Sequence, residues 1–137
     1  MSQAPEAIVR ALFASFADRE VDAALELVSP EFEFWPQGTA GRTGRGAPYN
    51  GRDGLREYFA DVARVWEHLR VEPGEFRVAG GGVVAFGIAR GHAIGEPHPV
   101  EVPVIWVFKL AGGLVASARV VATAAEADAA LASADTW

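Results

Sequence analysis

The sequence contains no cysteine among its 137 residues, which excludes disulfides, thiolate nucleophiles and cysteine metal clusters. It also lacks any run of about 18 apolar residues, the length that a membrane-spanning helix requires. The first thirty residues do not combine a basic start with an unbroken apolar segment, as a secretory signal would. We therefore expect a cytoplasmic protein without a membrane partner.

Basic residues are in the minority, since 12 Lys and Arg stand against 18 Asp and Glu and leave a net charge of −6. Such a field repels phosphate backbones and anionic lipids, which argues against nucleic acid as a partner. The three histidines, His68, His92 and His98, do not have the spacing of a metal-binding motif. We expect no metal and no cofactor.

The residues that are present suit a single globular fold. Hydrophobic residues make up 50% of the chain and charged residues 22%, a balance typical of soluble domains. The length provides for one domain, and no internal repeat divides it. We predict a single domain over residues 1–137, with residues 123–137 as a C-terminal helical tail.

Hydrophobic periodicity predicts helices first and then a run of strands. Apolar spacing of three and four indicates helices at 5–17, 20–28 and 53–69, with a short strand before Pro36. Beyond residue 69 the period changes to two, and glycine-rich or short loops connect the strand-like runs, which is typical of an antiparallel meander. The four runs are residues 70–79, 83–92, 100–110 and 114–122.

The chain is expected to end in another helix, because Thr123 and Glu126 have the spacing of a capping box. This order of elements predicts an α+β fold in which helices gather on one face of an antiparallel sheet. Three helices on a curved sheet can enclose a pocket.

Residues 36–51 hold five glycines and two prolines and show no periodicity, which predicts a long loop. We favour a mobile lid. The alternative is an anion site formed by backbone N–H groups with Arg42 and Arg45, although the ending of a P-loop is missing.

Four stretches carry a resemblance to a known superfamily: ALFASFADREVDAALELVSPEFEFW, YNGRDGLREYFADV, VEVPVIWVFKLAGGLVASARVV and AEADAALA. From about residue 5 to 133 the chain resembles the nuclear transport factor 2-like superfamily, in its SnoaL-like group near ketosteroid isomerases and polyketide cyclases. The resemblance implies a cone of N-terminal helices packed on a curved antiparallel sheet. It implies no single reaction, because the superfamily hosts isomerases, cyclases, epoxide hydrolases and proteins without known catalysis.

The resemblance also implies positions for a ketosteroid isomerase site, which needs a carboxylate base, a tyrosine and a protonated aspartic acid. In this chain those positions hold Trp35, Ala11 and Val102, and none of them can take the required role. Steroid isomerisation by the family mechanism is therefore not expected.

Two other family chemistries are also incomplete. The arginine of the limonene epoxide hydrolases has a counterpart in Arg119, but the flanking acidic positions are Val120 and Thr123. The late-strand acid of the SnoaL-like cyclases has only Glu101 as a distant substitute.

Strand alternation then provides the catalytic candidates. Phe86, Ile88, Arg90 and His92 share one face of their strand, and the resemblance implies that the first three point into the pocket. Arg90 could clamp a carboxylate or polarise a carbonyl; the alternative is a solvent-facing or carboxylate-paired Arg90. His92 could act as a base near neutral pH or lie exposed at the rim, and Glu33 is the third catalytic candidate.

Ligand-binding candidates extend this group. Tyr58 belongs to an apolar helix stripe and faces either the core or the cavity, and Tyr49 could close an occupied pocket or lie exposed. The complete predicted ligand-binding set is Trp35, Tyr49, Tyr58, Phe59, Phe86, Ile88, Arg90, Val102, Trp106 and Arg119.

Both faces of the strand at 100–110 are largely apolar. The face with Pro103, Ile105 and Val107 would be exposed unless a second subunit covered it, which predicts a homodimer through the sheet, as in relatives. Two functions remain open. One is isomerase- or cyclase-type proton transfer on a carbonyl substrate, and the other is a catalytically silent module that binds a small apolar or aromatic molecule.

Overall fold

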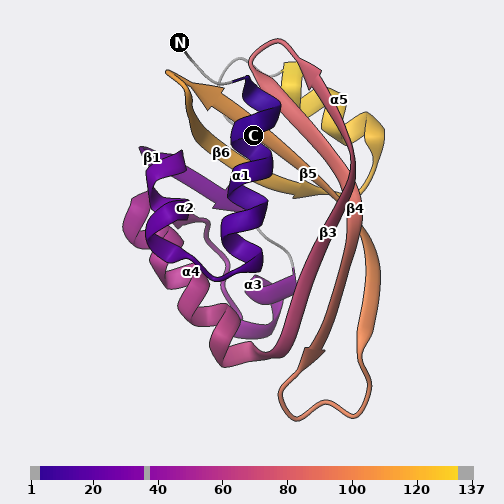
Figure 1. Cartoon of the computed structure of the whole chain (residues 1–137). Coiled ribbons are helices and arrows are strands. Elements are labelled where there is room, and N and C mark those ends of the chain that lie inside the picture. Colours follow the sequence, from indigo (N-terminus) through magenta and orange to yellow (C-terminus); the bar gives the residue numbers. More distant parts are fainter. Residues whose placement is uncertain (1–3, 36–37, 133–137) are drawn as a thin grey trace.

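The computed structural model describes residues 4–35 and 38–132 and contains helices and strands in the order that the periodicity predicts, with additional short elements (Figure 1). None of the described helices is both long and apolar enough to span a bilayer. The elements are α1 Pro5–Ala17, α2 Val21–Leu27, β1 Val28–Trp35, α3 Gly38–Thr43, β2 Tyr49–Asn50, α4 Gly51–Val65, β3 Trp66–Ala79, β4 Gly82–Ala93, β5 Val100–Ala111, β6 Leu114–Val121 and α5 Ala124–Ala132.

The described strands form a mixed, curved six-stranded sheet in the order β2-β1-β6-β5-β4-β3. The predicted antiparallel meander is confirmed for β3 to β6, while β1 joins β6 in parallel and β2 adds a short antiparallel edge. The predicted α+β cone is therefore confirmed. The long strands β3, β4 and β5 extend beyond α1, and their far end carries the loop between β4 and β5 (Figure 1).

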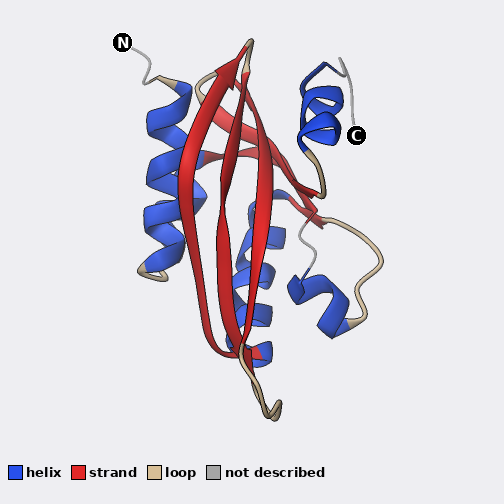
Figure 2. Cartoon of the chain, turned by 90° about the vertical axis from the view of Figure 1, so that its right-hand side faces the viewer, coloured by secondary structure: helices blue, strands red, loops and turns tan. Residues whose placement is uncertain are grey.

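The helices occupy both sides of the sheet. The N-terminal helices pack on the concave face, where Ile8 and Val9 of α1 join the main core. Ala127 and Ala130 of α5 pack on the opposite, convex face against Val84 and Val107, and Figure 2 shows α1 and α5 on opposite sides of the long strands. The N-terminal helices thus lie on one face as expected, and the C-terminal tail helix α5 covers part of the other.

The helix predicted to run to residue 69 ends at Val65, and Trp66 and Leu69 belong to β3. A β-bulge between Trp66 and His68 shifts the register. Because a bulge adds one residue to the strand, side chains three positions apart can lie on the same face. That spacing looks helical in the sequence, which explains the error.

The glycine-rich segment predicted as a long loop contains α3 and β2, and residues 36 and 37 of it lie outside the described residues. The C-terminal capping box is confirmed, because Thr123 Oγ1 accepts a 3.1 Å hydrogen bond from the backbone N–H of Glu126. The carboxylate of Glu126 accepts in turn from the N–H of Ala122 at 2.8 Å. Of the predicted tail, residues 133–137 lie outside the described part.

Candidate functional site

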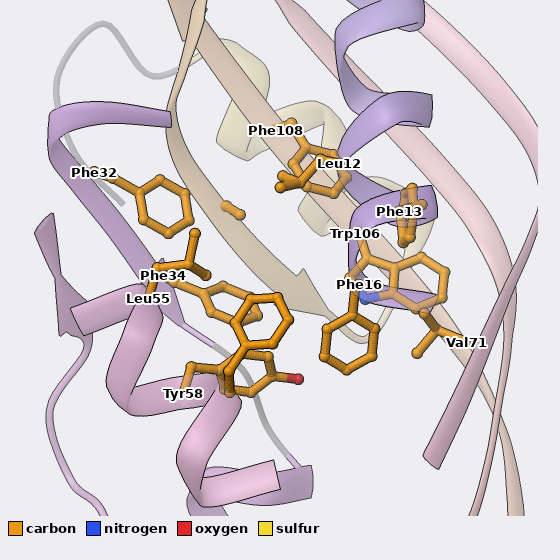
Figure 3. Close-up of a pocket in the computed structure, with 12 residues that line it drawn as sticks. Leu12, Phe13, Phe16, Phe32, Phe34, Leu55, Tyr58, Val71, Trp106 and Phe108 are labelled. Carbon is orange, nitrogen blue, oxygen red and sulfur yellow. The ribbon is translucent and has the colours of Figure 1, made fainter. Parts of the chain in front are cut away.

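The concave face of the cone encloses an apolar inner chamber of about 70 Å³. Aromatic rings from α1, β1, α4 and β5 converge on it, as Figure 3 shows. Its lining consists of Leu12, Phe13, Phe16, Phe32, Phe34, Leu55, Tyr58, Phe59, Val71, Trp106, Phe108 and Ala118.

A larger outer chamber of about 760 Å³ adjoins the inner one and shares four wall residues with it, Phe34, Tyr58, Val71 and Trp106. This volume falls within the roughly 300–1,000 Å³ of pockets that hold small molecules. The outer chamber lies between α3 and the ends of β5 and β6, and Val102 at its edge is 47% exposed. The two chambers together form a funnel that narrows toward the aromatic rings.

Tyr58 of α4 provides a polar group at the junction of the two chambers. Its ring lies edge-on to Phe34 at 4.7 Å and stacks near Phe16 at 5.8 Å between centroids. Figure 3 shows its hydroxyl directed away from α4 and toward Phe16. Burial raises the pKa of Tyr58 to about 12, although a hydrogen bond from Thr39 and the charge of Arg19 oppose this rise. The phenol is therefore neutral near neutral pH and can donate its proton.

Thr39 of α3 connects Tyr58 to the outer chamber. Its buried hydroxyl accepts a 3.0 Å hydrogen bond from the indole Nε1 of Trp66. An indole N–H can only donate, so the hydroxyl proton of Thr39 is available for the bond to Tyr58. When Tyr58 accepts from Thr39, its own O–H is left to serve a further acceptor in the cavity.

Arg42 lies one helical turn after Thr39 and also lines the outer chamber. Its guanidinium stacks 4.8 Å over the ring of Trp66, and Nη1 lies 3.5 Å from the carboxylate of Glu96. Trp66 thus contacts α3 twice, through its N–H and through its ring face.

A second phenol network has no signal in the sequence. Tyr49 is fully buried and donates a 2.7 Å hydrogen bond to the buried carboxylate of Asp61, which also pairs with Arg64. Burial, followed by the contact with Asp61, raises the pKa of Tyr49. The ring of Tyr49 lies 3.9 Å from Arg45. This network anchors the segment before α4 and does not line either chamber, so Tyr49 is a structural residue and not a pocket cover.

Four of the predicted ligand-binding residues do line the funnel: Tyr58, Phe59, Val102 and Trp106. The lining also includes Phe13 and Phe16 of α1, Phe32 and Phe34 of β1, and Thr39, Arg42 and Trp66. A sequence signal existed for β1, where Phe32 and Phe34 alternate with charged residues. No sequence signal existed for Thr39, because α3 lies in a glycine-rich segment without apolar periodicity.

The prediction that Phe86, Ile88 and Arg90 point into the cavity is wrong. The inward positions of β4 are the alternate ones, where Ala89 and Gly91 line the outer chamber. Phe86 packs instead toward the cluster beneath α5 on the convex face.

Arg90 pairs with carboxylates at the surface, which is the alternative to a ligand clamp that the sequence analysis gave. Its Nε lies 2.9 Å from Glu72, and a second nitrogen pairs with Glu101 across β5. The hydrogen bond to Glu72 and the charge of Glu101 raise the pKa of the exposed guanidinium. A surface carboxylate partner removes the basis for Arg90 as a ligand clamp.

The remaining candidates also lie away from the funnel. Glu33 accepts a 2.7 Å hydrogen bond from the indole of Trp35, and Arg119 lies 5.7 Å from the same ring, in register with Trp35. His92 Nε2 is 2.7 Å from the carbonyl oxygen of Glu96 at the β4 end. Arg90 and His92 line a separate surface hollow at the end of β4, but Glu33 lies apart from it, so the three predicted catalytic residues do not form one group.

The convex face is only partly open. Val107 is completely buried beneath α5, whereas Ile88 remains half-buried and Pro103 exposed. The homodimer through this face stays a prediction, which sedimentation equilibrium can test.

The funnel is poor in acid–base groups. Among the described residues that line it there is no aspartate, glutamate or histidine. Within residues 4–35 and 38–132, no cluster of three such side chains could hold a metal ion. Tyr58 and Arg42 are the main side chains in its wall that can interact with a ligand by hydrogen bonding or charge.

A cone of helices on a curved sheet, with a ligand-sized funnel, defines a nuclear transport factor 2-like protein. The family model described as SnoaL-like domain matches residues 9–118, and the chain therefore belongs to the SnoaL-like family. The resemblance inferred from the sequence is confirmed. No curated protein matches the chain significantly.

Solved structures share this fold over nearly the whole chain. A nuclear transport factor 2-like protein of unknown function from Burkholderia pseudomallei has a TM-score of 0.77 at 19% identity, covering 94% of this chain and 98% of its own. TerC, co-crystallised with polyporic acid, has a TM-score of 0.76 at 23% identity with the same coverage. SalBIII, an epoxide hydrolase/cyclase-like enzyme of pyran ring formation in salinomycin, has a TM-score of 0.70 at 25% identity, covering 88% and 92%.

Proposed function

We propose that the protein binds a small apolar or aromatic molecule in the funnel and that an oxygen of this ligand accepts a hydrogen bond from Tyr58. The observation that carries the proposal is the Tyr58 hydroxyl at the junction of two largely carbon-lined chambers. A few placed polar groups in an apolar pocket are typical of small-molecule sites.

The aromatic wall supports a flat apolar ligand. Phe13 meets the ring of Trp106 edge-on at 5.1 Å, and Phe16 lies beside Phe59 at 5.5 Å between centroids. These interactions hold the rings in place around the inner chamber, where a flat apolar guest would contact them. Structural neighbours co-crystallised with an organic acid or active in ring formation support a ligand of this kind.

The polar relay supports an oxygen acceptor on the ligand. Thr39, whose oxygen accepts from Trp66, donates its own proton to the phenol oxygen, so the proton of Tyr58 is left for another acceptor. A carbonyl or ether oxygen in the funnel supplies one.

Binding without catalysis is the function that the site supports best. Proton transfer beside a carbonyl requires a base, and the described lining residues include no carboxylate or imidazole. An isomerase or cyclase activity has support only from the chemistry named for its structural neighbours.

The test is calorimetric titration with two matched probes, 2-acetylnaphthalene and 2-ethylnaphthalene. We expect the ketone to bind more tightly than the hydrocarbon. Tyr58→Phe should remove this preference, a change of about 2- to 10-fold for one neutral hydrogen bond, and leave hydrocarbon affinity unchanged.

Tyr49→Phe is the matched control, because this second phenol donates to Asp61 outside the funnel. It should lower stability and keep the preference for the ketone. Failure of both probes to bind, or a preference that survives in Tyr58→Phe, would overturn the proposal.

A further inference from the structure

We propose that the ligand carries a carboxylate and that Arg42 binds this group at the outer chamber. The inference rests on the proposed function and deepens it by naming the ligand class, a small aromatic or similarly apolar carboxylic acid. Arg42 is the one charged side chain among the described residues that line either chamber.

The position of Arg42 fits a ligand that spans both chambers. Thr39 and Arg42 are three positions apart on α3, so their side chains lie on neighbouring turns of one face. Thr39 is coupled to Tyr58 at the chamber junction, and Arg42 lies in the outer wall. The helix α3 therefore places Thr39, the hydrogen-bond partner of Tyr58, and the cationic Arg42 on one side of the funnel.

Trp66 holds the guanidinium in an orientation suited to an anion. The N–H groups of a guanidinium lie in its own plane, so stacking on an aromatic face leaves them pointing outward along its edge. The guanidinium carbon of Arg42 lies 4.8 Å from the centroid of the Trp66 ring, which covers one face of the guanidinium. The N–H groups along the guanidinium edge are left for hydrogen bonding. A carboxylate can then bind with two parallel hydrogen bonds.

The present partner of Arg42 is easily exchanged. Its ion pair with Glu96 is a single 3.5 Å contact, and the Glu96 side chain is 53% exposed. Exposed ion pairs of this kind contribute little to stability. A ligand carboxylate bound bidentately beside the indole would make two shorter contacts, and Glu96 would return to solvent.

The net charge of the chain does not supply this attraction. At −6 the protein repels anions at long range, and screening at physiological ionic strength limits that field to about 8 Å. Arg42 is thus a local counter-charge in a funnel whose described wall holds no carboxylate. A neutral ligand of the same shape gains nothing from it.

The test compares 2-naphthoate with its methyl ester at neutral pH by calorimetric titration. We expect wild-type protein to bind the acid anion more tightly than the ester. Arg42→Gln should weaken naphthoate binding about tenfold or more, since hydrogen bonds to charged groups are the strong class, and change ester binding less than twofold. Arg42→Lys should recover part of the loss, because it keeps the charge and loses the fork.

Arg56→Gln is the matched control, since Arg56 is an exposed α4 residue that pairs with Asp53 outside the funnel. It should leave both affinities unchanged. The inference is overturned if wild-type protein binds the acid anion and the ester equally, or if Arg42→Gln keeps its affinity for naphthoate. Binding of the ester in either case still supports the proposed function. Failure of both probes to bind wild-type protein overturns the two proposals together.

Discussion

The indole Nε1 of Trp66 donates a 3.0 Å hydrogen bond to the hydroxyl of Thr39, and this bond joins the start of β3 to α3 at the wall of the funnel. Both groups are buried. The same hydroxyl is hydrogen-bonded to Tyr58, so one short relay orients the donor that we assign to the ligand.

Thr39→Val should break this relay. The substitution keeps the side-chain shape but leaves the Trp66 N–H without its partner, which costs about 1–3 kcal/mol of unfolding free energy. Urea denaturation checks the loss. A cycle with Trp66→Phe should show strong non-additivity, because either change removes the same bond; additive losses would contradict the relay.

Alkaline pH should destabilise the protein through its two phenols. The folded pKa of Tyr58 is about 12 and that of Tyr49 is also raised, whereas unfolded tyrosine titrates near 10. Between about pH 10 and pH 12 the unfolded chain therefore loses protons that the folded chain retains, and unfolding becomes easier as pH rises. The stability is intact below about pH 10.

Denaturation at a series of alkaline pH values measures this effect, and Tyr58→Phe should have a shallower decline than wild type. Phenolate absorbance offers an independent check, because the chain has only these two tyrosines. Ionisation of both phenols near pH 10 without unfolding would contradict their placement.

Arg90→Gln should leave ligand affinity unchanged, since Arg90 pairs with Glu72 and Glu101 on the convex face. Its stability should stay close to that of wild type, because the guanidinium is exposed. Calorimetry with the ketone and carboxylate probes checks the first point. A loss of binding comparable to that of Arg42→Gln would restore the original assignment of Arg90 to the site.

Gly91→Ala should distort the funnel. A Cβ atom at this position would lie 2.6 Å from Cζ3 of Trp66 and 3.3 Å from Leu69, so the indole must move. Overpacking of this kind costs about 1–3 kcal/mol, and the displaced Trp66 should weaken ketone binding. Gly46→Ala is the control, because nothing lies within 4 Å of its added carbon; equal effects of the two substitutions would argue against steric crowding at Trp66.

The sequence predicted the layers of the cone well, because helix and strand periods differ and short glycine turns mark the hairpins. It failed at the funnel because alternation along β4 does not say which face is inward. The larger apolar residues Phe86 and Ile88 looked like the pocket wall. The inward positions are instead small, and Gly91 leaves the space that Trp66 fills.

Two site residues could not be found from spacing alone. Thr39 and Arg42 lie on α3, whose six residues carry no apolar period. Their role depends on Trp66, which is more than twenty positions away and reaches α3 only in the folded cone. Tyr58, in contrast, lies on a regular apolar stripe, and its cavity-facing alternative could be predicted.

The most direct test of ligand binding in the funnel is a set of intermolecular nuclear Overhauser effects between bound 2-acetylnaphthalene and the protein. The account predicts contacts from the naphthalene protons to the rings of Tyr58, Phe59 and Trp106, which line the chambers. Contacts confined to Phe86 and Ile88 on the convex face would contradict it.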